Sequence, residues 1–202
     1  MKMGWLLGWA IPEKWFAPLA TAAFPDVVHR YFPATPDAVT QLQAAGPFDR
    51  VVGYSLGSLL LLQAAARGVA CGEVTLLAPV FAFPREENLG GKIARAHVRQ
   101  LSRWLRRDAG AALNDFYQRA GLDISPEPRA SDAIENLLWG LERLEQDRAV
   151  PHLPAGWRAW CGADDALLDA PQLAGSVSGV AIVAGGTHHP AGLLRAMAEG
   201  RS

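Results

Sequence analysis

The chain has 202 residues, of which 50% are hydrophobic and 19% charged, and its formal net charge is −1. This length allows one domain with a sizeable core but not two ordinary domains, and the composition excludes disorder over most of the chain. The small net charge excludes a whole-molecule field that would attract nucleic acid. No window of about eighteen apolar residues is free of charge, so we expect no membrane span.

The N-terminus and the cysteines indicate a cytoplasmic protein. The apolar N-terminal patch resembles a weak signal peptide, but Pro12, Glu13 and Lys14 interrupt it. Cys71 and Cys161 have neither disulfide-framework nor metal-site spacing. We therefore expect both to be buried free thiols in a reducing cytosol, and we expect no metal and no cofactor.

In chain order, six short apolar runs predict buried parallel strands. They are Trp5–Leu7, Val27–Phe32, Arg50–Tyr54, Glu73–Ala78, Ala159–Gly162 and Val180–Ala184. Helix-like stretches lie between or after them, at Pro36–Ala45, Leu56–Arg67 and Ala191–Glu199. This alternation, with right-handed crossovers, predicts an α/β fold: a mostly parallel, doubly wound sheet of about six strands with helices on both faces.

One region breaks the alternation. From Pro84 to Pro151 there is helical periodicity and charge but no strand signal. A crossover between parallel strands usually needs only about a dozen residues, so this stretch is too long to be one. We predict a helical lid insertion over residues 84–151, on a core formed by residues 1–83 and 152–202.

The stretch GYSLG places Ser55 between a predicted strand and a predicted helix, with Gly53 and Gly57 on either side. Glycines at these positions remove side chains that would clash in a tight strand-to-helix turn. Such a turn, called a nucleophile elbow, exposes the serine hydroxyl at a helix N-terminus, where developing negative charge is favoured. The backbone N–H of Leu56 is then a natural oxyanion donor. The alternative is an ordinary tight turn with a solvated serine.

A serine nucleophile needs a base, and the stretch GGTHHP follows the last predicted strand. Its position predicts a histidine at the same sheet edge as Ser55. His188 has the favoured spacing from the strand and His189 is its rival. The alternative for the pair is helix capping and surface solvation, and two adjacent histidines without a further cluster are poor evidence for a metal.

The base is usually oriented by a carboxylate, and GADDALLD follows the penultimate strand. Asp165 has the favoured spacing, and Asp164 is close behind it. Asp169 fits better as the cap of the next helix. Glu86 or Glu87 could supply an acid after the fourth strand but ranks lower. In the loop after the first strand, Gly8 permits Trp9 to offer a second oxyanion N–H and its indole to form a pocket wall.

The stretches GYSLG, GADDALL and GGTHHP, in this order, resemble the α/β-hydrolases. The opening WLLGWAIPEKW resembles the pimeloyl-acyl carrier protein methyl ester esterases of biotin synthesis. The resemblance covers roughly residues 1–80 and 155–200 and implies Ser55 as nucleophile, Asp165 as orienter and His188 as base, with Trp9 and Leu56 in the oxyanion hole. The chain departs from the family in having Leu7 where a histidine is usual, and in lacking two N-terminal antiparallel strands.

The predicted helix Lys92–Arg107 carries basic side chains at helical spacing on one face. Arg95, Arg99 and Arg103 could dock an acidic partner, and the resemblance implies an acyl carrier protein presenting an acyl ester. The alternative is a solvated face, because residues 84–150 hold eleven basic and eleven acidic residues.

These observations favour a serine carboxylesterase for a carrier-linked methyl ester. Two alternatives stay open: a thioesterase or small-ester or lipid hydrolase with the same triad, and a catalytically silent hydrolase fold that binds a partner.

Overall fold

The computed structural model describes residues 1–69, 72–126 and 131–200, with the side chains of residues 131 and 132 left aside. Six strands form one parallel sheet in the order β2-β1-β3-β4-β5-β6. Their bounds are β1 Lys2–Leu6, β2 Val28–Phe32, β3 Arg50–Tyr54, β4 Val74–Leu77, β5 Arg158–Gly162 and β6 Val180–Val183. The predicted α/β sheet is confirmed, with strand ends shifted by up to three residues.

Burial along the strands follows their place in the sheet. The central strands β3 and β4 are buried at almost every residue, as expected when helices cover both faces. The edge strands β2 and β6 are partly exposed, and Val28 and Ile182 are among the exposed large apolar side chains.

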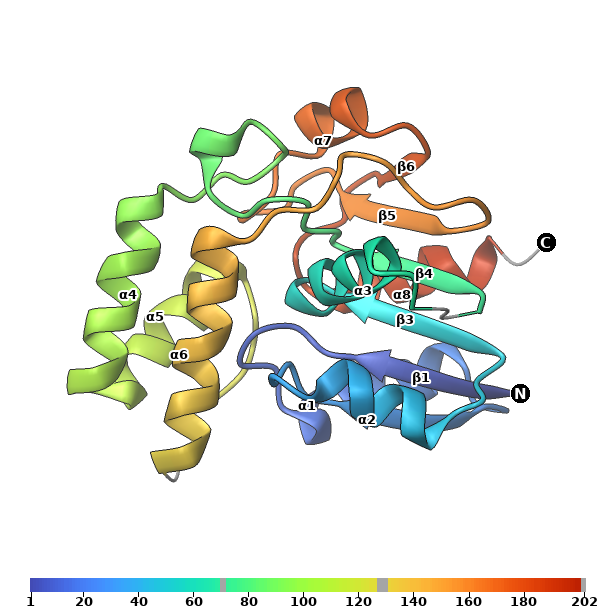
Figure 1. The fold of residues 1–202 in the computed structure, drawn as a ribbon, viewed down its shortest axis with the longest axis horizontal. Helices are drawn as coiled ribbons and strands as arrows, with labels where there is room; N and C mark the ends of the chain where they lie inside the picture. Colours follow the sequence, from blue (N-terminus) through green and yellow to red (C-terminus); the bar gives the residue numbers. More distant parts are fainter. Residues whose placement is uncertain (70–71, 127–130, 201–202) are drawn as a thin grey trace.

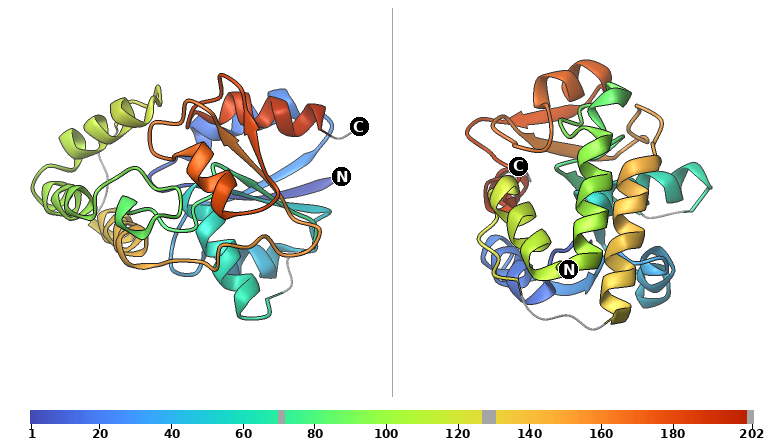
Figure 2. Two further views of the ribbon diagram at one scale, coloured as in Figure 1. Left: turned by 90° about the horizontal axis from the view of Figure 1, so that it is seen from above. Right: turned by 90° about the vertical axis from the view of Figure 1, so that its left-hand side faces the viewer.

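Two pairs of helices cover the two faces of the sheet. Helices α1 (Glu13–Ala23) and α8 (Pro190–Glu199) pack together on one face. On the other face lie α2 (Ala38–Ala45) and α3 (Leu56–Ala66) (Figure 2). Helix α7 (Ala170–Ser176) packs beside β6. Burial of α3 on nearly all sides explains why its sequence is almost entirely apolar.

Helix α1 is not among the helices predicted from the sequence, and Pro18 lies inside it although proline normally ends a helix. The buried pair Phe16 and Ala20, four residues apart, shows the face that packs on the core. Helix α2 begins at Ala38 rather than Pro36. The Asp37 carboxylate accepts hydrogen bonds from Thr35 and Gln41 instead of capping the backbone.

The described residues between 84 and 151, here called the helical segment, lie beyond the carboxyl ends of the strands (Figure 1). They include the short 3₁₀ turn η1 (Arg85–Glu87) and the helices α4 (Arg95–Arg107), α5 (Ala109–Ala120) and α6 (Ser131–Gln146). Helix α4 packs against both α5 and α6. The expected helix start at Lys92 is wrong: α4 begins at Arg95, because Lys92 belongs to an extended stretch that bonds to the loop after β5.

Cys161 is a buried free thiol, as expected, and burial raises its pKa to about 12. The prediction for Cys71 falls outside the described residues. Among the described helices, none combines the length and the apolar character needed to cross a bilayer.

Candidate active site

Ser55 occupies a tight turn between the end of β3 and the start of α3. Its backbone has φ 52° and ψ −119°, a strained conformation for a residue other than glycine. A Cβ on Gly57 would lie 2.1 Å from the Leu6 carbonyl oxygen, and one on Gly53 would lie 2.7 Å from Leu61. Glycine is therefore required on both sides, for the reason given from the sequence.

Ser58 holds this turn from inside α3. Its fully buried hydroxyl donates to the Ser55 carbonyl oxygen at 2.5 Å and accepts from the Val80 N–H at 2.8 Å. The Ser55 N–H donates to the Leu77 carbonyl at 2.9 Å. These bonds fix the strained backbone at Ser55 to the end of β4 and to the segment that follows it, so buried neighbours set the direction of the Ser55 side chain.

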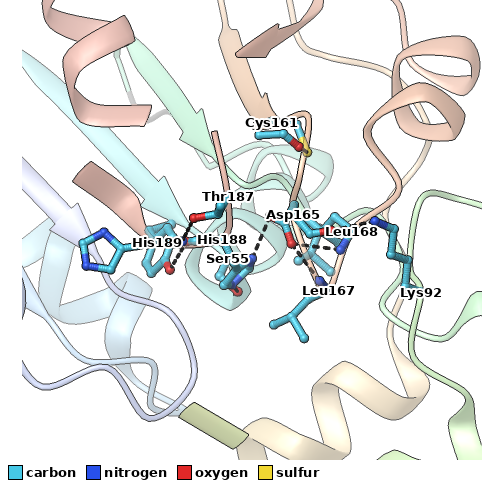
Figure 3. Close-up of polar contacts among 12 residues, drawn as sticks. Ser55, Lys92, Cys161, Asp165, Leu167, Leu168, Thr187, His188 and His189 are labelled. Carbon is cyan, nitrogen blue, oxygen red and sulfur yellow. Dashed lines mark hydrogen bonds and ion pairs between the residues drawn. The ribbon is translucent and has the colours of Figure 1, made fainter. Parts of the chain in front are cut away.

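His188 lies beside Ser55, in the loop between β6 and α8. Its Nε2 is 3.2 Å from the Ser55 Oγ, and its side chain is 2% exposed (Figure 3). The Tyr54 hydroxyl donates to the His188 backbone carbonyl at 2.7 Å, which fixes the loop. Burial and the charge of Asp165 raise the pKa of Tyr54, so its hydroxyl stays protonated and can donate this hydrogen bond.

Asp165 lies on the other side of the imidazole, with Oδ2 2.8 Å from His188 Nδ1. Its other oxygen accepts from the N–H groups of Leu167 and Leu168 at 2.8 and 3.0 Å. Burial raises the pKa of this carboxyl, but the attraction of His188 and these hydrogen bonds outweigh burial, and the pKa is lowered. Because an ionised carboxylate only accepts, Nδ1 carries the proton and Nε2 can accept one from Ser55.

The loops after β5 and β6 lie against each other at two glycines. A Cβ on Gly162 would lie 2.4 Å from the Gly186 carbonyl, and the Asp164 N–H donates to that carbonyl at 2.8 Å. This close contact brings Asp165 to His188. The Asp164 side chain is exposed, whereas Asp169 caps α7 by accepting from the Gln172 N–H.

Two other acids and one other histidine considered from the sequence point elsewhere. Glu86 accepts from the Arg95 backbone N–H, and Glu87 pairs with Arg95 and Arg148. His189 accepts from the Ala191 N–H and so caps α8. Its Nε2 lies 3.2 Å from an Asp123 oxygen rather than near Ser55.

The loop after β1 lies directly over Ser55. A Cβ on Gly8 would be 3.0 Å from the Ser55 Cβ, so the loop approaches closely only because residue 8 is glycine. Among the described residues, no acceptor is hydrogen-bonded to the backbone N–H of Trp9 or of Leu56. Leu56 follows Ser55 in the chain and Trp9 follows Gly8, so their assignment to an oxyanion hole stays a prediction.

A mostly apolar pocket of about 190 Å³ opens between this loop and the helical segment. From the core, it is lined by Trp9, the candidate oxyanion donor, and by Leu167 of the Asp165 loop, whereas Ser55, Asp165 and His188 are not among its lining residues. The rest of the lining comes from Phe83 and from the helical segment, including Leu101 and Phe116. The indole of Trp9 thus forms a pocket wall, as expected.

The three arginines named as a docking face lie in different settings. Arg95 pairs with Glu87 and donates to the Glu145 carbonyl at 2.6 Å, and Arg99 pairs with the Glu145 carboxylate at 2.6 Å. Arg103 is exposed, beside a surface groove between α4 and α6. Two of the three therefore hold α4 within the chain, and docking stays a prediction.

Sequence reasoning missed three residues of this site. Ser58 is the only polar residue between Leu56 and Leu62, a signal that could have identified it. Tyr54 and Lys92 gave no such signal. The Lys92 ammonium donates to the Asp165 backbone carbonyl at 2.6 Å (Figure 3), a contact across 73 residues that no local pattern indicates.

The parallel sheet, the turn at Ser55 and the helical segment after β4 define an α/β-hydrolase fold, and solved structures match it throughout. An esterase, EaEST, from Exiguobacterium antarcticum matches 99% of this chain and 90% of its own, with 12% identity and a TM-score of 0.69. The esterase RhEst1 from Rhodococcus sp. ECU1013 matches 100% and 91%, with 16% identity and a TM-score of 0.62.

BioG from Haemophilus influenzae matches 93% of this chain and 88% of its own, with 19% identity and a TM-score of 0.61. No family model matches the chain, and no curated protein matches it. Identities this low show the fold alone, and the same fold can carry unrelated functions. The function must therefore be argued from the site.

Proposed function

We propose that this protein is a serine hydrolase that cleaves an acyl ester. The observation that carries the proposal is the unbroken line from Ser55 Oγ to His188 Nε2 and from His188 Nδ1 to Asp165, at 3.2 and 2.8 Å. In this arrangement Ser55 is the nucleophile, His188 the general base and Asp165 the group that orients the imidazole. The strained backbone at Ser55 adds support, because strain that the surrounding structure maintains is found mostly at active sites.

The reaction has two steps. His188 takes the Ser55 proton as Oγ bonds to the ester carbonyl carbon, and the N–H groups of Trp9 and Leu56 stabilise the oxyanion. His188 then gives the proton to the leaving alcohol, which departs and leaves an acyl-enzyme. Water then attacks this acyl-enzyme and loses a proton to His188; the bond between the acyl carbon and Oγ breaks as His188 returns that proton to Oγ, which releases the acid and restores Ser55. No cofactor takes part in these steps.

The pocket supports a short acyl chain as the substrate class. A cavity of roughly 150 Å³ holds benzene, so about 190 Å³ has room for about six to eight carbon atoms. A pimeloyl chain falls in this range. The sequence resemblance to esterases that act on pimeloyl methyl esters, together with the fold shared with BioG, also favours this substrate.

The end of α4 is the surface we assign to an acyl carrier protein. Arg103, Arg106 and Arg107 are exposed there, whereas Arg95 and Arg99 are engaged in ion pairs. Carrier proteins are acidic, and unpaired surface arginines favour encounter with such a partner. We therefore propose that the docking face consists of Arg103, Arg106 and Arg107. Arg95 and Arg99, which the sequence also indicated, are no longer part of it.

The test of this function is hydrolysis of p-nitrophenyl butyrate by the wild type and by Ser55→Ala. We expect the substitution to lower kcat by at least about 10⁴-fold, because it removes the nucleophile. Ser102→Ala is the control, since Ser102 bonds only within α4. A Ser55→Ala protein that is folded and retains the wild-type rate would show that the mechanism is wrong.

The carrier-linked substrate needs its own test. A bacterial strain that lacks the pimeloyl ester-cleaving step grows without biotin only if this chain replaces that step. Hydrolysis of small esters or thioesters without complementation would favour the broader hydrolase. No turnover of any ester, with no reaction at Ser55, would favour a catalytically silent binding protein.

A further inference from the structure

Two buried side chains join the helical segment to the loop that carries Trp9. Tyr117 in α5 is 1% exposed, and its hydroxyl donates to the Ala10 backbone carbonyl at 2.6 Å. The Trp9 indole N–H donates to the Leu137 carbonyl in α6 at 2.8 Å. These contacts span 107 and 128 residues of sequence, so two separate helices hold one short loop of the core.

The backbone held by Tyr117 is strained. Ala10 has φ 60°, in the left-handed region that residues with a Cβ rarely adopt. Such a conformation persists when the surroundings fix it. The Ala10 carbonyl belongs to the peptide between Ala10 and Ile11, two peptide units after the one that carries the Trp9 N–H, so this hydrogen bond holds the loop close to the candidate oxyanion donor.

Helix α6 approaches the same loop at a glycine. A Cβ on Gly140 would lie 2.6 Å from Trp9 Cδ1 and 3.2 Å from a methyl carbon of Leu56. A glycine within a helix is less favourable than an alanine, so Gly140 lowers the stability of α6 itself. The absence of a side chain at residue 140 lets α6 lie against Trp9 and Leu56, the two candidate oxyanion donors.

We propose that Tyr117 and Gly140 are positioning residues for the oxyanion hole, an inference that rests on the proposed hydrolase function. Tyr117 fixes the loop from one side and the surface of α6 at Gly140 fixes the Trp9 ring from the other. The Trp9 N–H is thereby held in the direction that the developing oxyanion requires. The helical segment is then part of the catalytic apparatus and not only a cover over the pocket.

A displaced oxyanion donor weakens transition-state binding more than substrate binding, because the carbonyl oxygen becomes charged only in the transition state. Complete removal of a donor lowers kcat by about 10²- to 10³-fold. Loosening the loop should have a smaller effect. We expect Tyr117→Phe, which removes one hydroxyl, to lower kcat about tenfold and to leave KM within about twofold.

Each test variant has a matched control in the chain. Tyr31→Phe removes a hydroxyl whose bond to the Ala17 carbonyl is long, at 3.5 Å, and lies away from Ser55. For Gly140→Ala the control is Gly110→Ala in α5, where an added Cβ would meet its nearest neighbour at 3.6 Å. We expect Gly140→Ala to lower kcat about tenfold or more, and Gly110→Ala to leave it unchanged.

The experiment measures kcat and KM for p-nitrophenyl butyrate and the thermal midpoint of all four variants. A fall in kcat confined to Tyr117→Phe and Gly140→Ala, with KM retained, is the expected result. Equal kcat in test and control variants, or losses that follow the thermal midpoint, would overturn the positioning role. Failure of the proposed function looks different, because the wild type itself would then show no turnover dependent on Ser55.

Discussion

The strand-end loops and the helical segment both surround Ser55, but they differ in how their residues reach it. Ser55, Asp165 and His188 follow β3, β5 and β6, so a parallel sheet brings them to one edge. In the helical segment, Tyr117 and Lys92 instead donate to backbone carbonyls of two of these loops, and the Leu137 carbonyl accepts from the Trp9 indole. The core thus supplies the candidate reacting groups, and the helices hold the loops that carry them.

Helix α4 illustrates the second arrangement. Its inner side, including Val98 and Leu101, lines the pocket, while its outer side carries arginines beside a surface groove. One helix therefore faces the proposed acyl chain on one side and the proposed carrier on the other. The comparison predicts large effects on kcat from core substitutions, and smaller effects on substrate choice from the helical segment.

The largest effect is expected in the core, from His188→Ala. Loss of the base should lower kcat for p-nitrophenyl butyrate by about 10⁴-fold or more, because Ser55 would then have no proton acceptor. His189→Ala, which removes the α8 cap and the contact with Asp123, should stay within about threefold. Steady-state kinetics of both variants make the comparison. Equal losses, or a greater loss at His189, would contradict the assignment of the base.

An intermediate effect is expected from filling the pocket. Leu101→Trp adds volume to the α4 wall of a cavity of about 190 Å³. We expect kcat/KM for p-nitrophenyl hexanoate to fall about tenfold relative to the acetate, since buried space for a methylene group is worth about 1–3 kcal/mol. The ratio of the two specificity constants is the measurement. An unchanged ratio would mean that the acyl chain lies elsewhere.

The smallest effect is expected at the proposed docking surface. The double change Arg103→Glu and Arg106→Glu should raise KM for a carrier-linked ester about fivefold at low salt, and less at high salt. The control has the same change in charge at two exposed arginines elsewhere, Arg67→Glu and Arg195→Glu. If both double variants behave alike, the effect belongs to net charge and the docking surface is wrong.

The sequence predicted the strands and the turn because these features depend on neighbours in the chain. Continuous apolar runs indicated buried strands, and Gly53 and Gly57 indicated a turn that excludes side chains. The preference for His188 over His189 rested only on spacing from the last predicted strand. In the structure the His189 imidazole accepts a hydrogen bond from the Ala191 N–H and caps α8. The sequence does not show which histidine makes this contact.

The role of the helical segment was not readable from the sequence for a related reason. The residues around Tyr117 do not indicate that its hydroxyl bonds to Ala10. The positive φ of Ala10 could not be predicted either, because alanine rarely adopts this conformation. The description of the basic face from the sequence was also incomplete. Two of its arginines pair with Glu87 and Glu145, which lie on other elements. Contacts between distant segments decided each of these points.

The central claim is that Ser55 is an activated nucleophile, and reaction with a fluorophosphonate probe tests it most directly. Only a serine with a base beside it reacts readily with such a probe. We predict a single adduct on Ser55 in the wild type, located by peptide mass spectrometry, and its loss in His188→Ala. A folded wild-type protein that gains no adduct at Ser55, or one that is labelled equally well without His188, would contradict the account.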